Sequence, residues 1–228
     1  MIDSLDGNVL IIICSSFNFC ERLVKTLVKF NISIAIGAIL DERYYELCHN
    51  MGDNVVYFPV NLTDSADIKY LYENVRRSFN KNINFLINSV GFIGDDKQYN
   101  YKQLFSANCS SVINSCKVLK GLDSRCHILN FVLGDNHNYI SSYSCYVGCK
   151  FFNLGYLTNF QKSYLGKITN IYVNEMESDK VIYEDYENKY SYLDIIDIVD
   201  IISYYIQNLK LYDRKINLEF RSERLIKN

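Results

Sequence analysis

Short runs of consecutive apolar residues alternate along this chain with segments in which apolar residues recur at helical spacing. The first run covers residues 8–14, and the segment 19–30 that follows places Phe19, Leu23 and Leu27 on one helical face. A strand that is apolar throughout is buried on both faces, and a helix between two such strands joins them in parallel. The alternation therefore predicts a doubly wound α/β fold, in which helices cover both faces of a parallel sheet.

The same alternation continues through the rest of the sequence. The apolar runs predict strands over residues 8–14, 32–39, 55–60, 83–88, 127–133, 168–173 and about 214–220. The helical spacings predict helices over residues 19–30, 41–49, 65–79, about 104–120, about 142–164 and 193–208. Because no Pro-rich or Ser-rich linker, charge block or repeat interrupts them, we expect a single domain over residues 1–228 with a sheet of about seven strands. Such sheets bind ligands beyond the carboxyl ends of the strands, so functional residues are expected just after residues 14, 39, 61, 88, 133 and 173.

Composition and charge exclude several other classes of protein. The chain has 10 Gly and 1 Pro, where average usage would give roughly 16 and 11, so it is neither collagen-like nor Pro-rich. A net charge of −2 gives no basic surface, and nucleic acid is not an expected partner. No apolar run approaches the roughly 20 residues of a membrane span, and the first residues lack the basic region of a signal peptide. We therefore expect a soluble, cytoplasmic protein that does not bind a membrane.

The cysteines are expected to be reduced thiols rather than a disulfide framework. The chain has 8 Cys and no CxxC pair, and an unexported protein keeps its thiols reduced. A zinc set can be imagined from Cys126, His127, His137, Cys145 and Cys149, but these spacings fit no common ligand pattern. We expect no metal site, and small buried apolar side chains instead.

Tyr146 and Lys150 stand four residues apart in the helix predicted over about 142–164, so they share one helical face. An ammonium group beside a phenol lowers the phenol pKa, because the positive charge favours the phenolate. Such a pair can deliver a proton to a carbonyl, or remove one from an alcohol, while a cofactor moves hydride. In a chain with 20 Tyr, the alternative is a packed tyrosine beside a solvated lysine.

Other motifs give this pair a context. The fourth predicted strand ends in NSVG, Asn88 to Gly91, and Asn108 follows in a predicted helix. The third predicted strand ends in VNLTD, residues 60–64. These elements, in this order and followed by Tyr-x3-Lys, resemble the short-chain dehydrogenase/reductase family, nearest to its bacterial ketoacyl-reductase-like members. The resemblance covers nearly all of the chain and implies a Rossmann-type fold.

The resemblance implies a role for each matching residue. Tyr146 would be the general acid and base, Lys150 would lower its pKa and bind the nicotinamide ribose, and Asn108 would hold a water in the proton relay. Asn88 and Gly91 would shape the floor of the cofactor cleft. At the other end of the cleft, Asn61 and Leu62 would meet the adenine. The implied cofactor is NAD or NADP, the substrate is a small carbonyl or alcohol, and the implied assembly is a homodimer or homotetramer.

The turn after the first predicted strand departs from the family pattern. The family binds pyrophosphate there with TGxxxGxG, whose glycines permit special backbone angles and close approach to the phosphates. The aligned positions hold Ile13, Cys14, Asn18 and Cys20. Asn18 tolerates a positive φ and is expected to keep one turn, and Ser15, Ser16 and Asn18 are the candidate phosphate contacts beside a helix N-terminus. Two interpretations stay open: a rebuilt dinucleotide site, or a turn that no longer binds nucleotide.

A second departure lies at the end of the fifth predicted strand. The serine with which the family orients the substrate carbonyl stands 13 residues before the tyrosine, and here that position is Leu133. Leucine cannot donate a hydrogen bond, and losing one such donor costs roughly 3–4 kcal/mol of transition-state stabilisation. Asp135, Asn136 and Ser144 are the candidate replacements after a shift of the loop.

Two further positions leave the cofactor and the substrate open. After the sixth predicted strand the family's Pro-Gly turn is replaced by IYVNEMESD, and the short segment that follows predicts no large lid. The second predicted strand ends at residues 37–39 with neither an acid for a ribose hydroxyl nor a base for a 2′-phosphate. Asp41 and Arg43 follow together, so they do not choose between NAD and NADP, and we expect solvated residues that open a helix.

Two hypotheses for function follow. The first is an NAD(P)-dependent oxidoreductase that uses Tyr146, Lys150 and Asn108, which the motifs at these residues favour. The second is a non-catalytic member of the fold that serves as a binding or assembly module, which Leu133 and the missing glycines favour.

Overall fold

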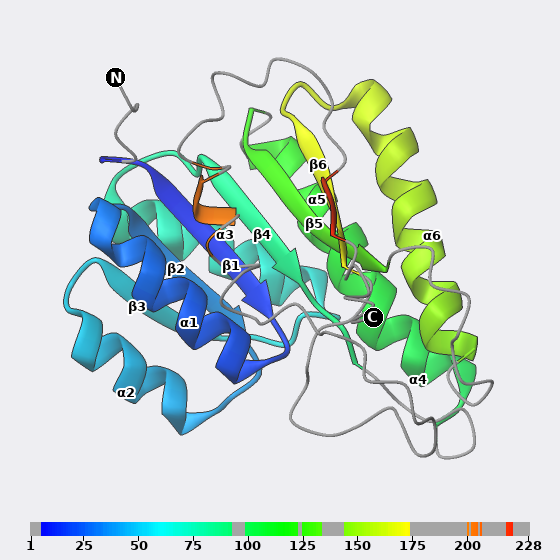
Figure 1. Cartoon of the computed structure of the whole chain (residues 1–228), viewed down its shortest axis with the longest axis horizontal. Helices are drawn as coiled ribbons and strands as arrows, with labels where there is room; N and C mark the ends of the chain where they lie inside the picture. Colours follow the sequence, from blue (N-terminus) through cyan, green and yellow to red (C-terminus); the bar gives the residue numbers. More distant parts are fainter. Residues whose placement is uncertain are drawn as a thin grey trace, which may run out of the picture.

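A parallel sheet with helices on both faces forms the centre of the computed structural model (Figure 1), which describes residues 6–92, 99–122, 125–133, 144–173, 200, 202–204, 206 and 218–220. The sheet has seven strands in the order β3-β2-β1-β4-β5-β6-β7, and every neighbouring pair is parallel. The strands are β1 (Val9–Cys14), β2 (Ser33–Ala38), β3 (Val55–Pro59), β4 (Phe85–Ser89), β5 (His127–Leu133), β6 (Ile168–Val173) and β7 (Leu218–Phe220). The predicted doubly wound, Rossmann-type α/β fold is confirmed.

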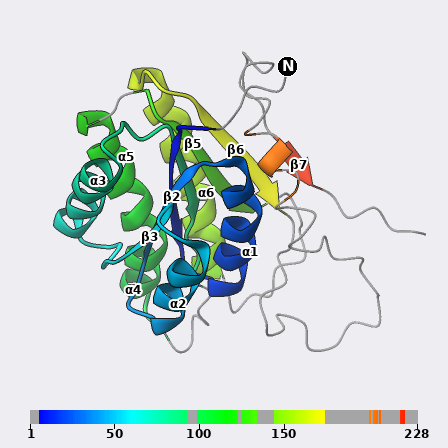
Figure 2. The same ribbon diagram turned by 90° about the vertical axis from the view of Figure 1, so that its left-hand side faces the viewer.

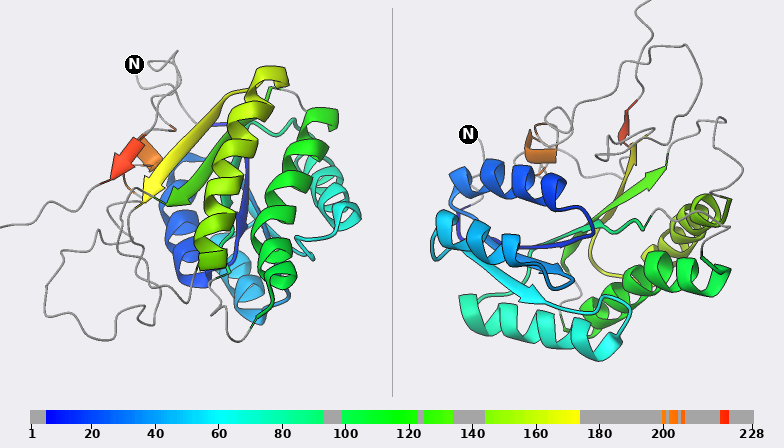
Figure 3. Two further views of the ribbon diagram at one scale, coloured as in Figure 1. Left: turned by 90° about the vertical axis from the view of Figure 1, so that its right-hand side faces the viewer. Right: turned by 90° about the horizontal axis from the view of Figure 1, so that it is seen from below.

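Helices form one layer on each face of the sheet (Figures 2 and 3). They are α1 (Phe17–Leu27), α2 (Glu42–Met51), α3 (Ser65–Phe79), α4 (Tyr101–Phe105), α5 (Ser111–Leu122) and α6 (Ser144–Phe160). Helices α1 and α2 pack on one face together with helical residues 202 and 206, and α3, α5 and α6 pack on the other. The alternating side chains of β1 divide between these layers, since Leu10 and Ile12 face α1 and α2 while Ile11 and Ile13 face the opposite side. Burial of each such aliphatic side chain contributes about 1.5–3 kcal/mol to folding.

Short polar side chains begin several of the helices that follow strands. Ser16, Asp41 and Asp64 are the N-caps of α1, α2 and α3, and each accepts a hydrogen bond from a backbone N–H of the first turn. Such caps satisfy amides that have no partner within the helix. Because each of these helices follows a parallel strand, their N-termini gather at the edge of the sheet where the strands end.

Several predicted boundaries change for local reasons. Helix α1 begins two residues earlier than predicted because Ser16 caps it. The helix predicted over about 104–120 is interrupted, since the π-helical turn Ser106–Ser110 (hereafter the π-turn) separates α4 from α5. The helix predicted over about 142–164 ends at Phe160 and continues as a 3-10 turn. Of the predicted helix 193–208, the structure describes residues 200, 202–204 and 206, which are helical.

The cysteines are free thiols, and most of them are buried. Within the described residues, no group of three or more His, Cys, Asp or Glu side chains is placed to hold a metal ion. Among the imagined zinc ligands, His137 lies outside the described residues. None of the helices in the described part of the chain combines the length and the hydropathy that crossing a membrane requires.

Candidate active site

The strand order reverses between β1 and β4, which makes the carboxyl ends of these strands the ligand-binding edge of such a sheet. The two ends lie side by side, with Cys14 paired to Ser89. The hydroxyl of Ser15 joins the turns that follow them, because Ser15 Oγ donates to the Gly91 carbonyl at 2.9 Å and accepts from the Gly91 N–H at 3.0 Å. Ser15, which was predicted to contact the cofactor, therefore ties the turn after β1 to the turn after β4.

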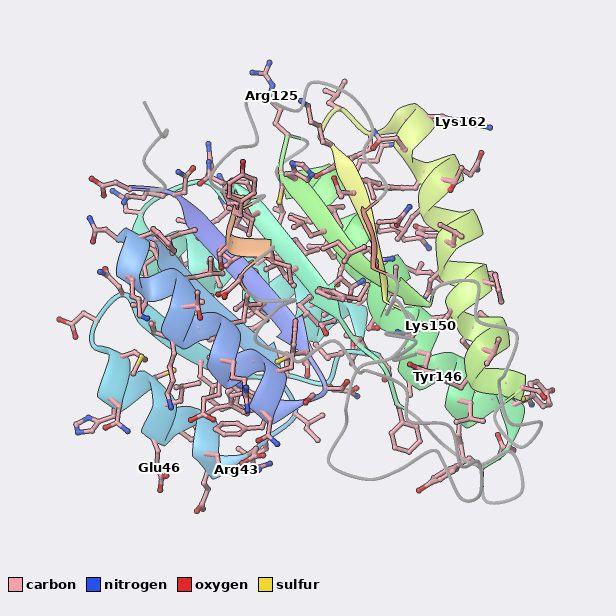
Figure 4. All side chains as sticks on the ribbon, viewed as in Figure 1. Arg43, Glu46, Arg125, Tyr146, Lys150 and Lys162 are labelled. Carbon is pink, nitrogen blue, oxygen red and sulfur yellow. The ribbon has the colours of Figure 1, made fainter. Side chains whose placement is uncertain are left out.

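Tyr146 and Lys150 lie in the first two turns of α6, at the edge where the strands end (Figure 4). Lys150 is buried, its Nζ donates to the Val90 carbonyl at 2.7 Å, and Nζ lies 5.5 Å from the centre of the Tyr146 ring. Burial lowers the pKa of Lys150 to about 8, because the charged form loses its hydration. The ammonium group and the phenol are thus close together, as the four-residue spacing predicts.

Gly91 lies directly against this pair. A methyl group on Gly91 would stand 3.2 Å from Lys150 Nζ and 3.3 Å from Tyr146 Oη. Both distances are tighter than most real contacts of a side-chain carbon, so the absence of a side chain at Gly91 keeps the space beside the phenol and the ammonium group open. The fold therefore brings together three of the predicted site residues, one from the turn after β4 and two from α6, which are far apart in the sequence.

Asn108 occupies the middle of the π-turn and is fully buried. Its Oδ1 accepts from the Phe92 N–H at 2.8 Å, and its Nδ2 donates to the Phe92 carbonyl at 3.0 Å and to the Leu104 carbonyl at 2.9 Å. The side chain therefore holds the segment that follows Gly91. The Asn108 carbonyl accepts from Asn153 Nδ2 at 2.9 Å, so the backbone atom of the predicted relay residue has a side-chain donor from α6.

Asn153 is a residue of this site that the sequence reasoning missed. It is buried, and it lies seven residues after Tyr146 and three after Lys150 on the same face of α6. The sequence did contain a signal for it, because a polar residue shares the helical face of the predicted catalytic pair. Its meaning depended on the position of the π-turn, which no local pattern revealed.

Asn88 belongs to a ladder of asparagines inside the sheet. Asn88, Asn130 and Asn170 stand in register on β4, β5 and β6. Asn88 Nδ2 donates to Asn130 Oδ1 at 3.2 Å, and Asn130 Nδ2 donates to Asn170 Oδ1 at 3.5 Å. Asn88 is buried, and its Oδ1 has no partner among the described residues. The side chain therefore supports the end of β4 from within the sheet, beneath the turn that carries Gly91.

The cysteines at the former glycine positions point into the core. Cys14 and Cys20 are buried in the layer between the sheet and helices α1 and α2, where Cys14 Sγ lies 3.4 Å from Tyr44 Oη. The surrounding apolar atoms raise the pKa of Cys20 well above its ordinary value. Ser15 and Ser16 are exposed at the N-terminus of α1. The two thiols thus fill core space, and the outer surface of the turn carries the hydroxyl groups of Ser15 and Ser16.

The expectation that Asn18 holds a left-handed turn is wrong. Among the described residues, only Asn31 and Asn80 have a positive φ without being glycine. Asn18 lies inside the first turn of α1, because Ser16 is still extended and the helix begins at the next residue. The turn therefore needs no glycine for its backbone angles.

The residues predicted to meet the adenine lie after β3. The side chain of Asn61 closes its own loop, since Oδ1 accepts from the Thr63 N–H at 3.1 Å and from Thr63 Oγ1 at 2.8 Å. Leu62 packs in the apolar layer beneath α3. Strands β2 and β1 separate this loop from β4, so a ligand that touched both Asn61 and Gly91 would have to extend across the edge of the sheet.

Asp41 and Arg43 pair with each other at the start of α2. The Asp41 carboxylate caps α2 and binds the Arg43 side chain through Nε at 3.1 Å and Nη2 at 2.7 Å, and this guanidinium lowers the pKa of Asp41. Arg43 Cζ lies 4.5 Å above the ring of Phe17, the first residue of α1. The two side chains therefore occupy each other in one ion pair, and the guanidinium also covers a ring at the start of α1 (Figure 4).

Leu133 is the last residue of β5, where it pairs with Val173 of β6. Of its candidate replacements, Ser144 begins α6 and is exposed, whereas Asp135 and Asn136 lie outside the described residues. The segment that begins at residue 174, where the family's Pro-Gly turn is replaced, also lies outside them.

Comparisons with known proteins agree with this architecture. The sequence profile described as short chain dehydrogenase matches residues 8–181. A comparison with curated proteins gives no match. Among solved structures, a short-chain dehydrogenase/reductase from Serratia marcescens BCRC 10948 superposes with a TM-score of 0.81 at 13% identity, over 96% of this chain and 98% of that one.

Two other solved structures have the same fold. A 3-ketoacyl-(acyl-carrier-protein) reductase from Brucella melitensis, complexed with NADH, has a TM-score of 0.79 at 14% identity and covers 98% of this chain and 100% of its own. A serine dehydrogenase from Escherichia coli has a TM-score of 0.74 at 15% identity, over 93% of this chain and 96% of its own. At such low identity these likenesses establish the fold alone.

Proposed function

This chain belongs to the short-chain dehydrogenase family, and we propose that it is an NAD(P)-dependent oxidoreductase acting on a small carbonyl or alcohol. The observation that carries the proposal is the meeting of Tyr146, Lys150 and Gly91 at the reversal of strand order. A desolvated ammonium group beside a phenol, with an open face in front of both, is an arrangement suited to proton transfer at a substrate oxygen.

Tyr146 Oη is the proposed proton donor in reduction and the proton acceptor in oxidation. The Lys150 ammonium stabilises the phenolate form of Tyr146, and the hydrogen bond to the Val90 carbonyl holds Lys150 in place. The bound nicotinamide supplies or accepts the hydride. Because Leu133 stands where the family has a serine donor, Tyr146 is the hydrogen-bond donor to the substrate oxygen in this proposal.

The cofactor would extend along the edge of the sheet from Gly91 towards β3. Asn88 and Gly91 would form the floor of the cleft, and Lys150 would bind the nicotinamide ribose. Ser15 and Asn18 would face the phosphates at the N-terminus of α1, where backbone amides attract anions. Asn61 and Leu62 would border the adenine. The burial of Cys14 and Cys20 on the core side supports this placement, because neither thiol fills the outer surface of the turn.

The experiment that tests the function is a titration of the purified protein with NADH and NADPH, followed by thermal shift and by cofactor fluorescence. Binding raises the unfolding temperature in proportion to the logarithm of the ligand concentration over Kd. We expect saturable binding, followed by oxidation of the cofactor with a panel of small ketones and aldehydes. No response at millimolar cofactor would contradict the proposal and leave the binding or assembly module as the better hypothesis.

We expect NADPH to bind more tightly than NADH. The Arg43 guanidinium lies over the ring of Phe17 at the start of α1, and the Asp41 carboxylate, which would otherwise suit a ribose hydroxyl, is paired with that guanidinium and caps α2. The Arg43→Ala variant should bind NADPH about tenfold more weakly while its affinity for NADH stays unchanged. Calorimetric titration of both cofactors measures the difference.

A matched control for this variant is Arg77→Ala, in the last turn of α3. It removes an exposed arginine from a different region, and both cofactor affinities should stay at their wild-type values. Equal weakening of NADH and NADPH binding by Arg43→Ala would show that this side chain does not read the 2′-phosphate.

The outer surface of α4 and α6 is the proposed contact with a second copy of this chain. Phe105, Phe151 and Phe152 are 40%, 51% and 40% exposed, and the rings of Phe105 and Phe152 lie 5.0 Å apart. Clustered apolar rings of this size mark an interface rather than a solvated surface. We expect a homodimer or homotetramer in sedimentation velocity at micromolar concentration, and dissociation to monomers in the Phe151→Glu variant.

The control for that variant is Tyr70→Glu, which places the same charge on an exposed aromatic position of α3. It should leave the assembly intact. A wild-type protein that sediments as a monomer would contradict the predicted assembly without touching the proposed chemistry.

A further inference from the structure

A closed series of hydrogen bonds joins α6 to the end of β4. From α6, Lys150 Nζ reaches the Val90 carbonyl at 2.7 Å. Two residues further along, the backbone of Phe92 is held on both sides by the Asn108 side chain, at 2.8 and 3.0 Å. The series returns to α6 when Asn153 Nδ2 donates to the Asn108 carbonyl at 2.9 Å. Gly91, which faces Tyr146 and Lys150, lies between the two anchored positions.

The carbonyl that Asn153 reaches belongs to the π-turn. A π-turn replaces i→i−4 hydrogen bonds with i→i−5 ones, so the regular helical pairing of its carbonyls is disturbed. Asn108 is fully buried, and a buried carbonyl without a donor costs free energy that water cannot restore. Asn153 gives this carbonyl a side-chain donor from the neighbouring helix, since it is 2% exposed and its Nδ2 donates to that oxygen.

The other end of the Asn153 amide shows that the residue does not simply maximise stability. Asn153 Oδ1 is buried and has no hydrogen-bond partner among the described residues. A buried acceptor left unpaired opposes folding, and an apolar side chain of the same branching would avoid that cost. What the asparagine adds is a directed tie between α6 and the π-turn.

We propose that Asn153 is a positioning residue for Tyr146 and Lys150, which sets the depth of α6 against the end of β4 through the Asn108 carbonyl. The inference rests on the proposed function for its catalytic consequence. Tyr146, Lys150 and Asn153 lie on one face of one helix, so loss of the tie at Asn153 frees the turns that carry the other two. Small displacements of a reacting group lower a rate strongly without preventing binding.

The first test is the kinetics of the Asn153→Leu variant. We expect kcat to fall about 10- to 100-fold while KM for the cofactor changes less than about threefold. The unfolding temperature should change little, because the variant removes one unpaired acceptor and creates another. Asn153→Ala, which also lacks the donor, provides the same measurement if the leucine variant does not fold.

The matched control is Gln161→Leu, just beyond the other end of α6. Gln161 Nε2 donates to the Gly166 carbonyl at 3.0 Å, so it also ties this helical segment to a backbone carbonyl through an amide. Its removal should lower the unfolding temperature and leave kcat unchanged. Equal loss of kcat in both variants would show that any loosening of α6 has this effect and would overturn the specific role of Asn153.

The second test needs no substrate and no cofactor, because it follows the titration of Lys150. Among the described residues, the titratable side chains around Lys150 are Tyr146 and Cys149 on its own helix and Cys109 on the π-turn. The pH dependence of unfolding is compared between wild type and Lys150→Met, and between Asn153→Leu and the Asn153→Leu/Lys150→Met double variant. Each pair differs only at Lys150, so the contributions of other groups cancel.

The first comparison is between wild type and Lys150→Met. The ratio of their unfolding equilibrium constants should fall by a factor on the order of 100 between pH 8 and 10.5. In this range the buried lysine has lost its proton, whereas the lysine of the unfolded chain has kept it. Between Asn153→Leu and the double variant, the same ratio should change by a smaller factor. A loosened α6 admits water to Lys150, and hydration brings the folded pKa of Lys150 closer to its unfolded value. An unchanged factor together with an unchanged kcat would overturn the inference. A wild-type protein without cofactor binding or turnover would instead overturn the proposed function, and the titration would then decide the role of Asn153.

Discussion

Replacing Tyr146 with phenylalanine is expected to lower kcat by about 10²- to 10⁴-fold, the range that a positioned acid or base contributes. The phenol is the proposed proton donor at the substrate oxygen, and no other matched residue replaces it, because Leu133 has no proton to give. The ring would still pack beside Lys150 and Gly91. Cofactor affinity, measured by fluorescence titration, should therefore stay within a few-fold of the wild-type value.

The control for this variant is Tyr156→Phe on the same helix. Tyr156 is half-buried and stacks between the rings of Phe152 and Phe160, and burial raises its pKa to about 12. Removal of its hydroxyl should leave kcat unchanged. If Tyr146→Phe retained wild-type turnover, Tyr146 would not be the acid.

Replacing Lys150 with methionine is expected to abolish turnover and to stabilise the protein at pH 7. Burial lowers the pKa of Lys150 from 10.5 to about 8, so folding at pH 7 carries the cost of burying a charge. Methionine has similar length and no charge. Allowing for the lost hydrogen bond to the Val90 carbonyl, the gain in the free energy of unfolding should be about 1–3 kcal/mol.

The gain should depend on pH in a defined direction. The folded pKa lies below the unfolded one, so between pH 8 and 10.5 the unfolded chain binds more protons and wild-type stability gains relative to the variant. The advantage of Lys150→Met is therefore complete below pH 8 and gone above 10.5. Urea denaturation across this range measures it, with the exposed Lys162→Met as a control expected to change stability by less than about 0.5 kcal/mol. A less stable variant at pH 7 would show that the ammonium group is well solvated or fully paired.

The wild-type rate should follow the same titration. Lys150 must be charged to stabilise the phenolate of Tyr146, so carbonyl reduction is expected to decline as the pH rises above about 8.

Much of the fold and part of the candidate site were predictable from local pattern. The run VLIIIC has no polar position, and the structure buries every residue of it. The four-residue spacing of Tyr146 and Lys150 places both at the end of one helix beside Gly91. The predicted helix around Asn108 was less accurate, because a π-turn inserts one residue per turn without a compositional mark.

Other features depended on partners that are distant in the sequence. Sequence alignment marked Cys14 and Cys20 as obstacles to phosphate binding, whereas the structure buries both beneath the turn. The local sequence at Asp41 and Arg43 did not reveal that the ring of Phe17 lies under the guanidinium or that the carboxylate caps α2. Asn153 had no apparent role until its amide was found against the Asn108 carbonyl.

The sequence by itself determined the order of strands and helices, the parallel sheet between two helical layers, and the spacing of the Tyr146–Lys150 pair. These follow from burial, because a continuous apolar run and a period of 3.6 residues are properties of single segments. Only the tertiary structure decided which layer receives the Cys14 side chain, which atoms hold Lys150, and which donor reaches the π-turn. The physical reason is that a buried polar atom needs a partner at one distance and direction, and packing of segments far apart in the chain sets that geometry.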